Sequence, residues 1–98
     1  MLYLLMIKTF KCKETAKVYE REFSKKLPQD IQRVVYRKLL MIDSAIDIED
    51  LRIPPANRLE KLSGDRDGQY SIRVNKQYRL CFNWENGFAL DVELVDYH

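Results

Sequence analysis

Length, composition and charge limit what this protein can be. The chain has 98 residues, 46% hydrophobic and 33% charged, with three glycines and three prolines. These values predict one globular domain over residues 1–98, and they exclude a second domain, low-complexity sequence and intrinsic disorder. The net charge of +2 hides an asymmetry, because residues 1–38 hold 10 Lys/Arg against 4 Asp/Glu, whereas residues 39–98 hold 7 against 11. A basic first half attracts phosphate or acidic partners, but on charge alone solvated helix faces explain it better.

The cysteine and histidine content argues against disulfides and metal binding. Cys12 and Cys81 form no CxxC pair, and two thiols do not make the disulfide framework of a small secreted protein. We therefore expect a reduced, cytoplasmic protein. His98 is the only histidine and no metal-ligand spacing is visible, so we expect no metal. The sequence has no phosphate-binding loop, dinucleotide-binding glycine motif or nucleophile elbow, and we expect no cofactor.

The apolar N-terminal stretch, residues 1–6, is far shorter than the ~20 residues of a membrane span and lacks the charged start of a signal peptide. We expect no membrane association. Residues 1–5 are either an upstream-start extension before Met6 or a part of the first strand, and the two alternatives are equally compatible with the sequence.

The first elements in chain order are a short strand and a helix. Residues 7–10 are predicted to be a strand. The apolar residues that follow recur at helical spacing and predict one buried stripe on a first helix, formed by Cys12, Ala16, Tyr19 and Phe23.

A second helix is predicted to begin at Pro28, which suits a first helical turn, and to end near Ser44. Its expected core side consists of Ile31, Val34, Val35, Leu39 and Ile42, and its expected exposed side of Gln32, Arg33, Arg37 and Lys38. Residues 46–58 are acidic and then proline-containing, and they predict a loop with one helical turn at 48–51.

From residue 58 onward the hydrophobic period changes to two. A weak strand at 58–62 precedes a turn at 63–68, and three strong strands follow, with apolar residues on one parity: Tyr70, Ile72 and Val74; Tyr78, Leu80, Phe82 and Trp84; Phe88, Leu90, Val92 and Leu94. Asn86-Gly87 is the strongest short signal for a hairpin between the last two strands.

The predicted fold class is α+β, in the order β-α-α-β-β-β-β, with two helices on the apolar face of one antiparallel sheet. The other face is expected to be polar and to present Arg73 and Arg79 from neighbouring strands. Their guanidinium groups match phosphate oxygens, although on these residues alone solvated strand arginines paired with Asp91 or Glu93 are the more ordinary arrangement. The final Asp96, Tyr97 and His98 offer three groups that can move protons or stack on a base, or they form a frayed tail.

Ordered motifs over residues 7–98 carry a family resemblance. They are an opening Ile-Lys-x-Phe, the run LRxPPxNRLExLxGDRxGxxSIRVNxxxRxxF, and the closing Asp96-Tyr97-His98. On these motifs the chain resembles the HigB family of toxins within the RelE superfamily. The resemblance implies a RelE-like microbial RNase fold and metal-independent, ribosome-dependent cleavage of mRNA. It also implies neutralisation by a helix-turn-helix HigA-like antitoxin, through which alone the toxin reaches operator DNA.

The resemblance also implies site residues. Arg79 resembles the phosphate-stabilising arginine of the family, and Asp96, Tyr97 and His98 resemble its C-terminal catalytic group. Two positions depart from the family pattern, because Glu60 stands where a histidine is expected and Ser63 where a lysine is expected. Glu60 can still accept a proton, so we include it among the catalytic candidates.

The missing lysine charge at position 63 is either replaced by a neighbouring cation, or this branch is a weaker nuclease. The candidate replacements are Arg58, Lys61 and Arg66. Together with Arg73, these three are the candidate RNA-binding residues.

Residues 96 and 98 share the alternation parity of apolar Leu90, Val92 and Leu94, so a bend or bulge is required to bring them to the polar face. Two alternative functions remain compatible with the same fold, a ParE-like inhibitor of DNA gyrase and a non-catalytic binding module.

Overall fold

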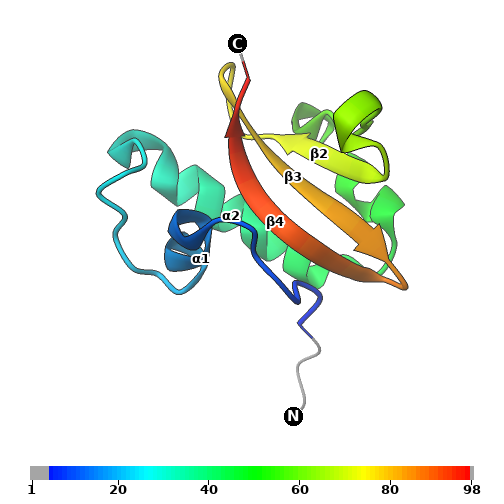
Figure 1. Cartoon of the computed structure of the whole chain (residues 1–98), viewed down its shortest axis with the longest axis horizontal. Coiled ribbons are helices and arrows are strands. Elements are labelled where there is room, and N and C mark those ends of the chain that lie inside the picture. The colour runs from blue at the N-terminus through cyan, green and yellow to red at the C-terminus, as the bar shows by residue number, and fades with distance from the viewer. Residues whose placement is uncertain (1–4, 98) are drawn as a thin grey trace.

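The structure is a computed structural model that describes residues 5–97. Two helices, α1 (Lys13–Tyr19) and α2 (Gln32–Ser44), precede a four-stranded antiparallel sheet in the order β1-β2-β3-β4. The strands are β1 (Glu60–Lys61), β2 (Gln69–Arg73), β3 (Tyr78–Glu85) and β4 (Phe88–Asp96). Figure 1 shows α2 running behind the strands, and both helices contact β4. The α+β class with helices on one face of an antiparallel sheet is confirmed.

The segment predicted as the first strand forms only two isolated parallel bridges to β4, Ile7 to Ala89 and Phe10 to Val92. Lys8 N–H donates to the Ala89 carbonyl at 2.9 Å, and Lys11 N–H to the Val92 carbonyl at 3.0 Å. The ladder between these bonds is interrupted, because Asp91 N–H donates to Thr9 Oγ1 at 2.8 Å instead of to a backbone carbonyl. The expected pairing is therefore present, but a regular strand is not. Residues 1–4, which one alternative assigned to this strand, lie outside the described residues.

The predicted stripe of α1 is wrong in part. The buried residues of α1 are Thr15 and Val18, and the helix ends at Tyr19, so that Phe23 lies beyond it with 56% of its surface exposed. The chain leaves the helix at Arg21, whose φ is +65°, and Glu22 N–H donates to the Lys17 carbonyl while Arg21 N–H donates to the Val18 carbonyl. This pair of bonds is a Schellman motif, which usually contains glycine and therefore gave no signal in the sequence.

Helix α2 agrees with the prediction at its end and along most of its core face. Ile31, in the short 3-10 helix η1 (Gln29–Ile31), and Val35, Leu39 and Ile42 are buried, and Val34 is half-buried. Lys38 was expected on the exposed side, yet it is only 5% exposed. Its ammonium donates to Asn57 Oδ1 in another short helix, η3 (Pro55–Asn57), so a distant polar partner accounts for its burial. The predicted helical turn before it is confirmed as η2 (Ile48–Arg52).

The alternation predicted for β2 and β3 is confirmed, with Ile72, Leu80 and Phe82 fully buried in the core against α2. The predicted Asn86-Gly87 hairpin is also present. Both residues have positive φ, +53° and +83°, as a two-residue type I′ turn requires.

Strand β4 departs from simple alternation. Ala89 was not predicted as core, yet the buried residues of β4 are Ala89 and Val92, while Phe88 and Leu90 are half-buried. The register shifts between Asn83, which pairs with Leu90, and Cys81, which pairs with Glu93. This is a β-bulge, and Asp91 adopts a positive φ of 54° within it. The extra residue moves the core-facing parity from odd to even positions along the strand.

None of the helices in the described part of the chain is long and apolar enough to cross a membrane.

Candidate active site

Arg79 lies in the middle of a set of polar contacts on the sheet face opposite the helices. Its Nε donates to Ser71 Oγ at 2.7 Å, and its Nη2 donates to the Arg58 carbonyl at 2.6 Å and to the Ser71 carbonyl at 3.3 Å. The residue is 8% exposed. These bonds hold the guanidinium in one orientation, so Arg79 is a fixed, nearly buried cation and not the solvated strand arginine paired with Asp91 or Glu93 that was the alternative.

The remaining nitrogen of Arg79, Nη1, faces Glu60. It lies 3.9 Å from Glu60 Oε1, and the Glu60 side chain is 56% exposed. Glu60 pairs with Ser71 in the β1–β2 register, which places both residues on the same face of the sheet. The carboxylate therefore stands between the Arg79 guanidinium and solvent, where it can accept a proton from a bound molecule.

Tyr97 belongs to a second group of side chains on this face. The Cys81 thiol donates to Tyr97 Oη at 3.9 Å. Burial, and next the neighbouring Cys81, raise the pKa of the Tyr97 phenol above its ordinary value. Burial also raises the pKa of the Cys81 thiol. Both groups thus keep their protons at neutral pH, and the phenol retains a hydrogen that it can donate.

Arg66 interacts electrostatically with both members of this second group, Cys81 and Tyr97. Its Nη1 donates to Glu93 Oε1 at 2.9 Å and to Gln69 Oε1 at 3.0 Å. The bond to Glu93 raises the pKa of the Arg66 guanidinium. Glu93 also forms an ion pair with Lys11, whose Nζ lies 3.8 Å from Glu93 Oε1. The positive charge of Arg66 is therefore partly compensated before any ligand binds.

The bulge at Asp91 determines which residues of the C-terminal strand reach this face. Cys81 pairs with Glu93 and Arg79 pairs with Val95, so alternation puts Tyr97 on the Arg79 side. Asp96 pairs with Tyr78, on the core-facing parity, and its Oδ2 accepts a bond from Gln77 Nε2 at 3.1 Å. The expectation that a bulge brings Asp96 to the polar face is wrong, because the bulge lies at Asp91, before Val92, and directs Tyr97 to the polar face while Asp96 stays at the edge of the sheet. His98 lies outside the described residues.

The other predicted RNA-binding residues are distributed around the site. Arg58 is exposed, has a φ of 45°, and supplies the carbonyl that holds Arg79. Lys61 is exposed, and its register partner Tyr70 places it on the opposite face from Glu60. Arg73 pairs with Arg79, but its Nε donates to the Asn75 carbonyl at 3.1 Å at the β2–β3 turn. The structure thus groups Arg79, Glu60 and Tyr97 on one face and separates Lys61 and Asp96 from it.

Sequence reasoning missed the residues that position the candidate catalytic groups. Ser71 anchors Arg79, and Glu93 anchors Arg66. Strand alternation alone placed Ser71 on the polar face, but it contained no signal for the hydrogen bond to Arg79. Within the described residues, no three His, Cys, Asp or Glu side chains lie together as a metal site requires.

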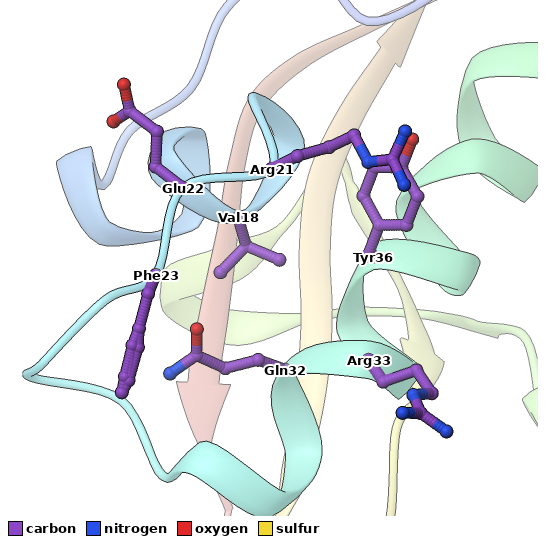
Figure 2. A pocket seen from close by; sticks show the side chains of 7 residues that line it. All are labelled: Val18, Arg21, Glu22, Phe23, Gln32, Arg33 and Tyr36. Atoms are coloured by element: carbon purple, nitrogen blue, oxygen red, sulfur yellow. The ribbon is translucent and has the colours of Figure 1, made fainter.

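A pocket also lies between the two helices, on another part of the surface (Figure 2). Its volume is about 250 Å³, and it is lined by Val18, Arg21, Glu22, Phe23, Gln32, Arg33 and Tyr36. The Arg21 guanidinium lies over the Tyr36 ring, 5.4 Å from its centroid, and Figure 2 shows the two side chains against each other. Gln32 Nε2 fixes the wall by donating to the Ser24 carbonyl at 2.7 Å. In contrast to Arg79, the two arginines of this pocket are exposed.

Comparison with known proteins identifies relatives along nearly the whole chain. The model of the family described as "RelE-like toxin of type II toxin-antitoxin system HigB" matches residues 8–98. "Toxin HigB-1" of Vibrio cholerae serotype O1 is 48% identical over 86 residues, which are 87% of this chain and 90% of that protein. "Endoribonuclease HigB" of Proteus vulgaris is 37% identical over 94 residues, 95% of this chain and 100% of that protein.

Among solved structures, the "YoeB-YefM complex from Staphylococcus aureus" contains a similar chain, with a TM-score of 0.61 and 21% identity over 96% of this chain and 97% of that one. At this identity the likeness concerns the fold, which is two helices on a four-stranded antiparallel sheet. The family model and the two curated relatives confirm the resemblance inferred from the sequence motifs. The chain belongs to the HigB family of RelE-like toxins of type II toxin–antitoxin systems.

Proposed function

We propose that this toxin is a metal-independent endoribonuclease that cuts mRNA on the ribosome and thereby stops translation and growth. The observation that carries the proposal is the fixed guanidinium of Arg79, which lies within 3.9 Å of the exposed Glu60 carboxylate on the open face of the sheet. The relative from Proteus vulgaris is named an endoribonuclease, which supports the same chemistry here.

Cleavage of RNA by its own 2′-hydroxyl has three requirements. The hydroxyl proton must be removed, the extra charge on the pentacoordinate phosphorus must be stabilised, and the departing 5′-oxygen must receive a proton. As the bond from the 2′-oxygen to phosphorus forms, the bond to the 5′-oxygen breaks. The products are a 2′,3′-cyclic phosphate and a free 5′-hydroxyl, and the protons balance without a co-reactant.

Arg79 suits the second task because its orientation is set before substrate binds. Three of its donor contacts are satisfied by Ser71 and the Arg58 carbonyl, and Nη1 is directed to the exposed side next to Glu60. A donor that is already oriented needs no reorganisation as charge develops on the phosphate, and such preorganised groups contribute most to electrostatic catalysis.

The proton-transfer roles follow from position and protonation state. We assign proton removal from the 2′-hydroxyl to Glu60, because Asp96, the other carboxylate expected at the site, lies at the edge of the sheet. Tyr97 keeps its proton because its pKa is raised, so it serves as a donor to the substrate. His98, which follows Tyr97 directly, is the proposed acid for the 5′-oxygen.

Arg58, Arg73 and Arg66 are the proposed RNA contacts, whereas Lys61 faces away from Glu60 and is no longer among them. Arg58 is exposed, and Arg73 is half-buried at the β2–β3 turn. Arg66 would share its guanidinium with Glu93, so we expect a smaller contribution from it. The charge missing at Ser63 is then supplied mainly by the exposed Arg58, whose backbone carbonyl binds Arg79.

The proposed partner is a HigA-like helix-turn-helix antitoxin, through which the toxin would reach operator DNA. Membership in a family of type II toxin–antitoxin systems supports this partner, and the similar Staphylococcus aureus structure is itself a toxin–antitoxin complex by its title. We propose that the protein acts in the cytoplasm, where mRNA and ribosomes are found.

The test uses purified protein with translating ribosomes and a defined mRNA, with 5′ ends mapped by primer extension. We expect new 5′ ends with the wild-type protein even after it has been treated with EDTA to remove bound metal. We expect none with Arg79→Lys, which retains the charge but loses the planar fork of donors. Arg52→Lys is the matched control, because Arg52 is exposed and its one ion pair among the described residues is with Glu49, three positions earlier. Absence of new 5′ ends with the wild type would reject the nuclease, and a gyrase supercoiling assay would then separate a ParE-like inhibitor from a binding module.

A further inference from the structure

A cationic cavity, separate from the polar residues around Arg79, lies between α2, η3 and the β2–β3 turn. Its volume is about 380 Å³, and four of its lining residues are the cations Arg37, Lys38, Arg73 and Lys76. The other lining residues are Ala56, Val74 and Asn75, so none of the described residues that line it is acidic.

Lys38 makes this cavity more than a patch of surface charge. The residue is 5% exposed and its ammonium is held by Asn57 Oδ1, a neutral acceptor. Burial, and next the neighbouring Arg37, lower the pKa of the Lys38 ammonium. A buried cation without a carboxylate partner is electrostatically unsatisfied, and an incoming anion would compensate it.

The opposite wall of the cavity is equally ordered. Arg73 Nε donates to the Asn75 carbonyl, and Asn75 Oδ1 in turn accepts from Gln77 N–H at 2.8 Å and Tyr78 N–H at 2.7 Å. These bonds close the turn and fix the direction of the Arg73 guanidinium. The cavity therefore combines an oriented fork of donors with a buried point charge, a combination that matches a tetrahedral phosphate.

The cavity is connected to the candidate active site through neighbouring residues. Lys38 binds Asn57, the next residue Arg58 supplies the carbonyl bound by Arg79, and Arg73 is the register partner of Arg79. An RNA strand with one phosphate at Arg79 would thus carry a neighbouring stretch of backbone past the cavity.

We propose that this cavity, formed by Arg37, Lys38, Arg73 and Lys76, binds a backbone phosphate of the RNA at a position away from the cleaved bond. The inference rests on the proposed function, since it takes RNA as the substrate. It adds a phosphate-binding site that holds the register of the strand relative to Arg79.

The test measures binding of a 2′-O-methyl oligoribonucleotide, which cannot be cut, at several salt concentrations. Arg37→Ala/Lys76→Ala removes two exposed cations of the cavity, and Lys13→Ala/Lys25→Ala is the matched control with the same loss of charge at exposed positions outside it. We expect the cavity variant to bind more weakly and to reduce the slope of log Kd against log salt by about 0.7, the value for one phosphate contact on a single strand. The control should keep the wild-type slope.

A second measurement locates the contact. Inorganic phosphate titrated into the wild-type protein should shift the amide resonances of Val74, Asn75 and Lys76 in a saturable manner, and this effect should be lost in Lys76→Glu. Equal slopes for the cavity variant and the control would overturn the proposal, even if inorganic phosphate binds, because the site would then take free phosphate and not RNA. Since the oligonucleotide is not cleaved, failure of the nuclease assay leaves this measurement valid, and the two proposals can fail separately.

Discussion

Arg79 donates a 2.6 Å hydrogen bond to the backbone carbonyl of Arg58, a residue 21 positions earlier in the chain. This bond joins β3 to the segment that leads into β1, and it sets both the orientation of the guanidinium and the position of Glu60 next to it. The same side chain is therefore a candidate catalytic group and a structural link.

Substitution of Arg79 should consequently affect both activity and stability. Arg79→Ala leaves the Arg58 and Ser71 carbonyls and Ser71 Oγ without their donor, and a buried unsatisfied polar group costs about 1–3 kcal/mol. For a domain of this size we expect a Tm lower by about 4–8 °C for each kcal/mol, measured by circular dichroism. Because lost growth inhibition could then reflect unfolding, Arg79→Lys is the variant for activity.

Ser71→Ala tests positioning separately from charge. It removes the acceptor of Arg79 Nε while the guanidinium and Glu60 remain. We expect kcat for cleavage to fall by roughly tenfold with little change in KM, because a small misplacement of a catalytic group slows the reaction without weakening substrate binding. Equal reduction of binding and turnover would instead indicate that Ser71 contacts the substrate.

The alkaline limit of stability should depend on the Cys81–Tyr97 pair. The pKa of each group is raised in the folded protein, so the folded state holds these protons more tightly than the unfolded chain. Their contribution to the free energy of unfolding is fully present at pH values below the pKa of each group in the unfolded chain. It is lost as the pH rises through the pKa of each group in the folded protein, above roughly pH 8.5 for a thiol and pH 10 for a phenol. Urea unfolding from pH 7 to 11 should show a shallower loss for Cys81→Ala/Tyr97→Phe than for the wild type. Parallel curves would contradict the shifted pKa values.

The N-terminal segment should depend on Asp43. This buried carboxylate accepts from Tyr19 Oη at 2.6 Å and from Ile7 N–H at 3.0 Å, and so ties the start of the chain to α1 and α2. Tyr19→Phe should lower the free energy of unfolding by about 1–3 kcal/mol, the usual range for one partner lost from a buried charged acceptor. Tyr36→Phe is the control, because the Tyr36 contact with Arg21 involves the ring and not the hydroxyl; a similar loss in both variants would argue against this role of Asp43.

The next prediction concerns His98, the proposed general acid. His98→Ala should lower ribosome-dependent cleavage by about 10² to 10⁴, the usual contribution of a positioned general acid or base. His98→Gln keeps a hydrogen-bonding side chain but cannot titrate near neutral pH. If His98→Gln cleaves at the wild-type rate with the same pH dependence, proton transfer by His98 is excluded, and the residue is a binding contact at most.

Much of the fold follows from local patterns in the sequence. The period-two alternation of β2 and β3, the Asn86-Gly87 turn and the end of α2 at Ser44 are each determined by residues within a few positions, and each agrees with the structure. The polar face carrying Arg79 was predictable for the same reason, because alternation depends only on the backbone of one strand.

The arrangement of the site was decided by the tertiary structure. The bulge at Asp91 changes which C-terminal residues face Arg79, and no glycine marks it. Lys38 is buried because Asn57, 19 residues later, accepts its hydrogen bond, and Arg79 is fixed because the Arg58 carbonyl reaches it across the sheet. Period and propensity describe neighbours along the chain, whereas these partners become neighbours only after folding, so the sequence by itself determined which chemical groups are present and the tertiary structure decided which of them meet.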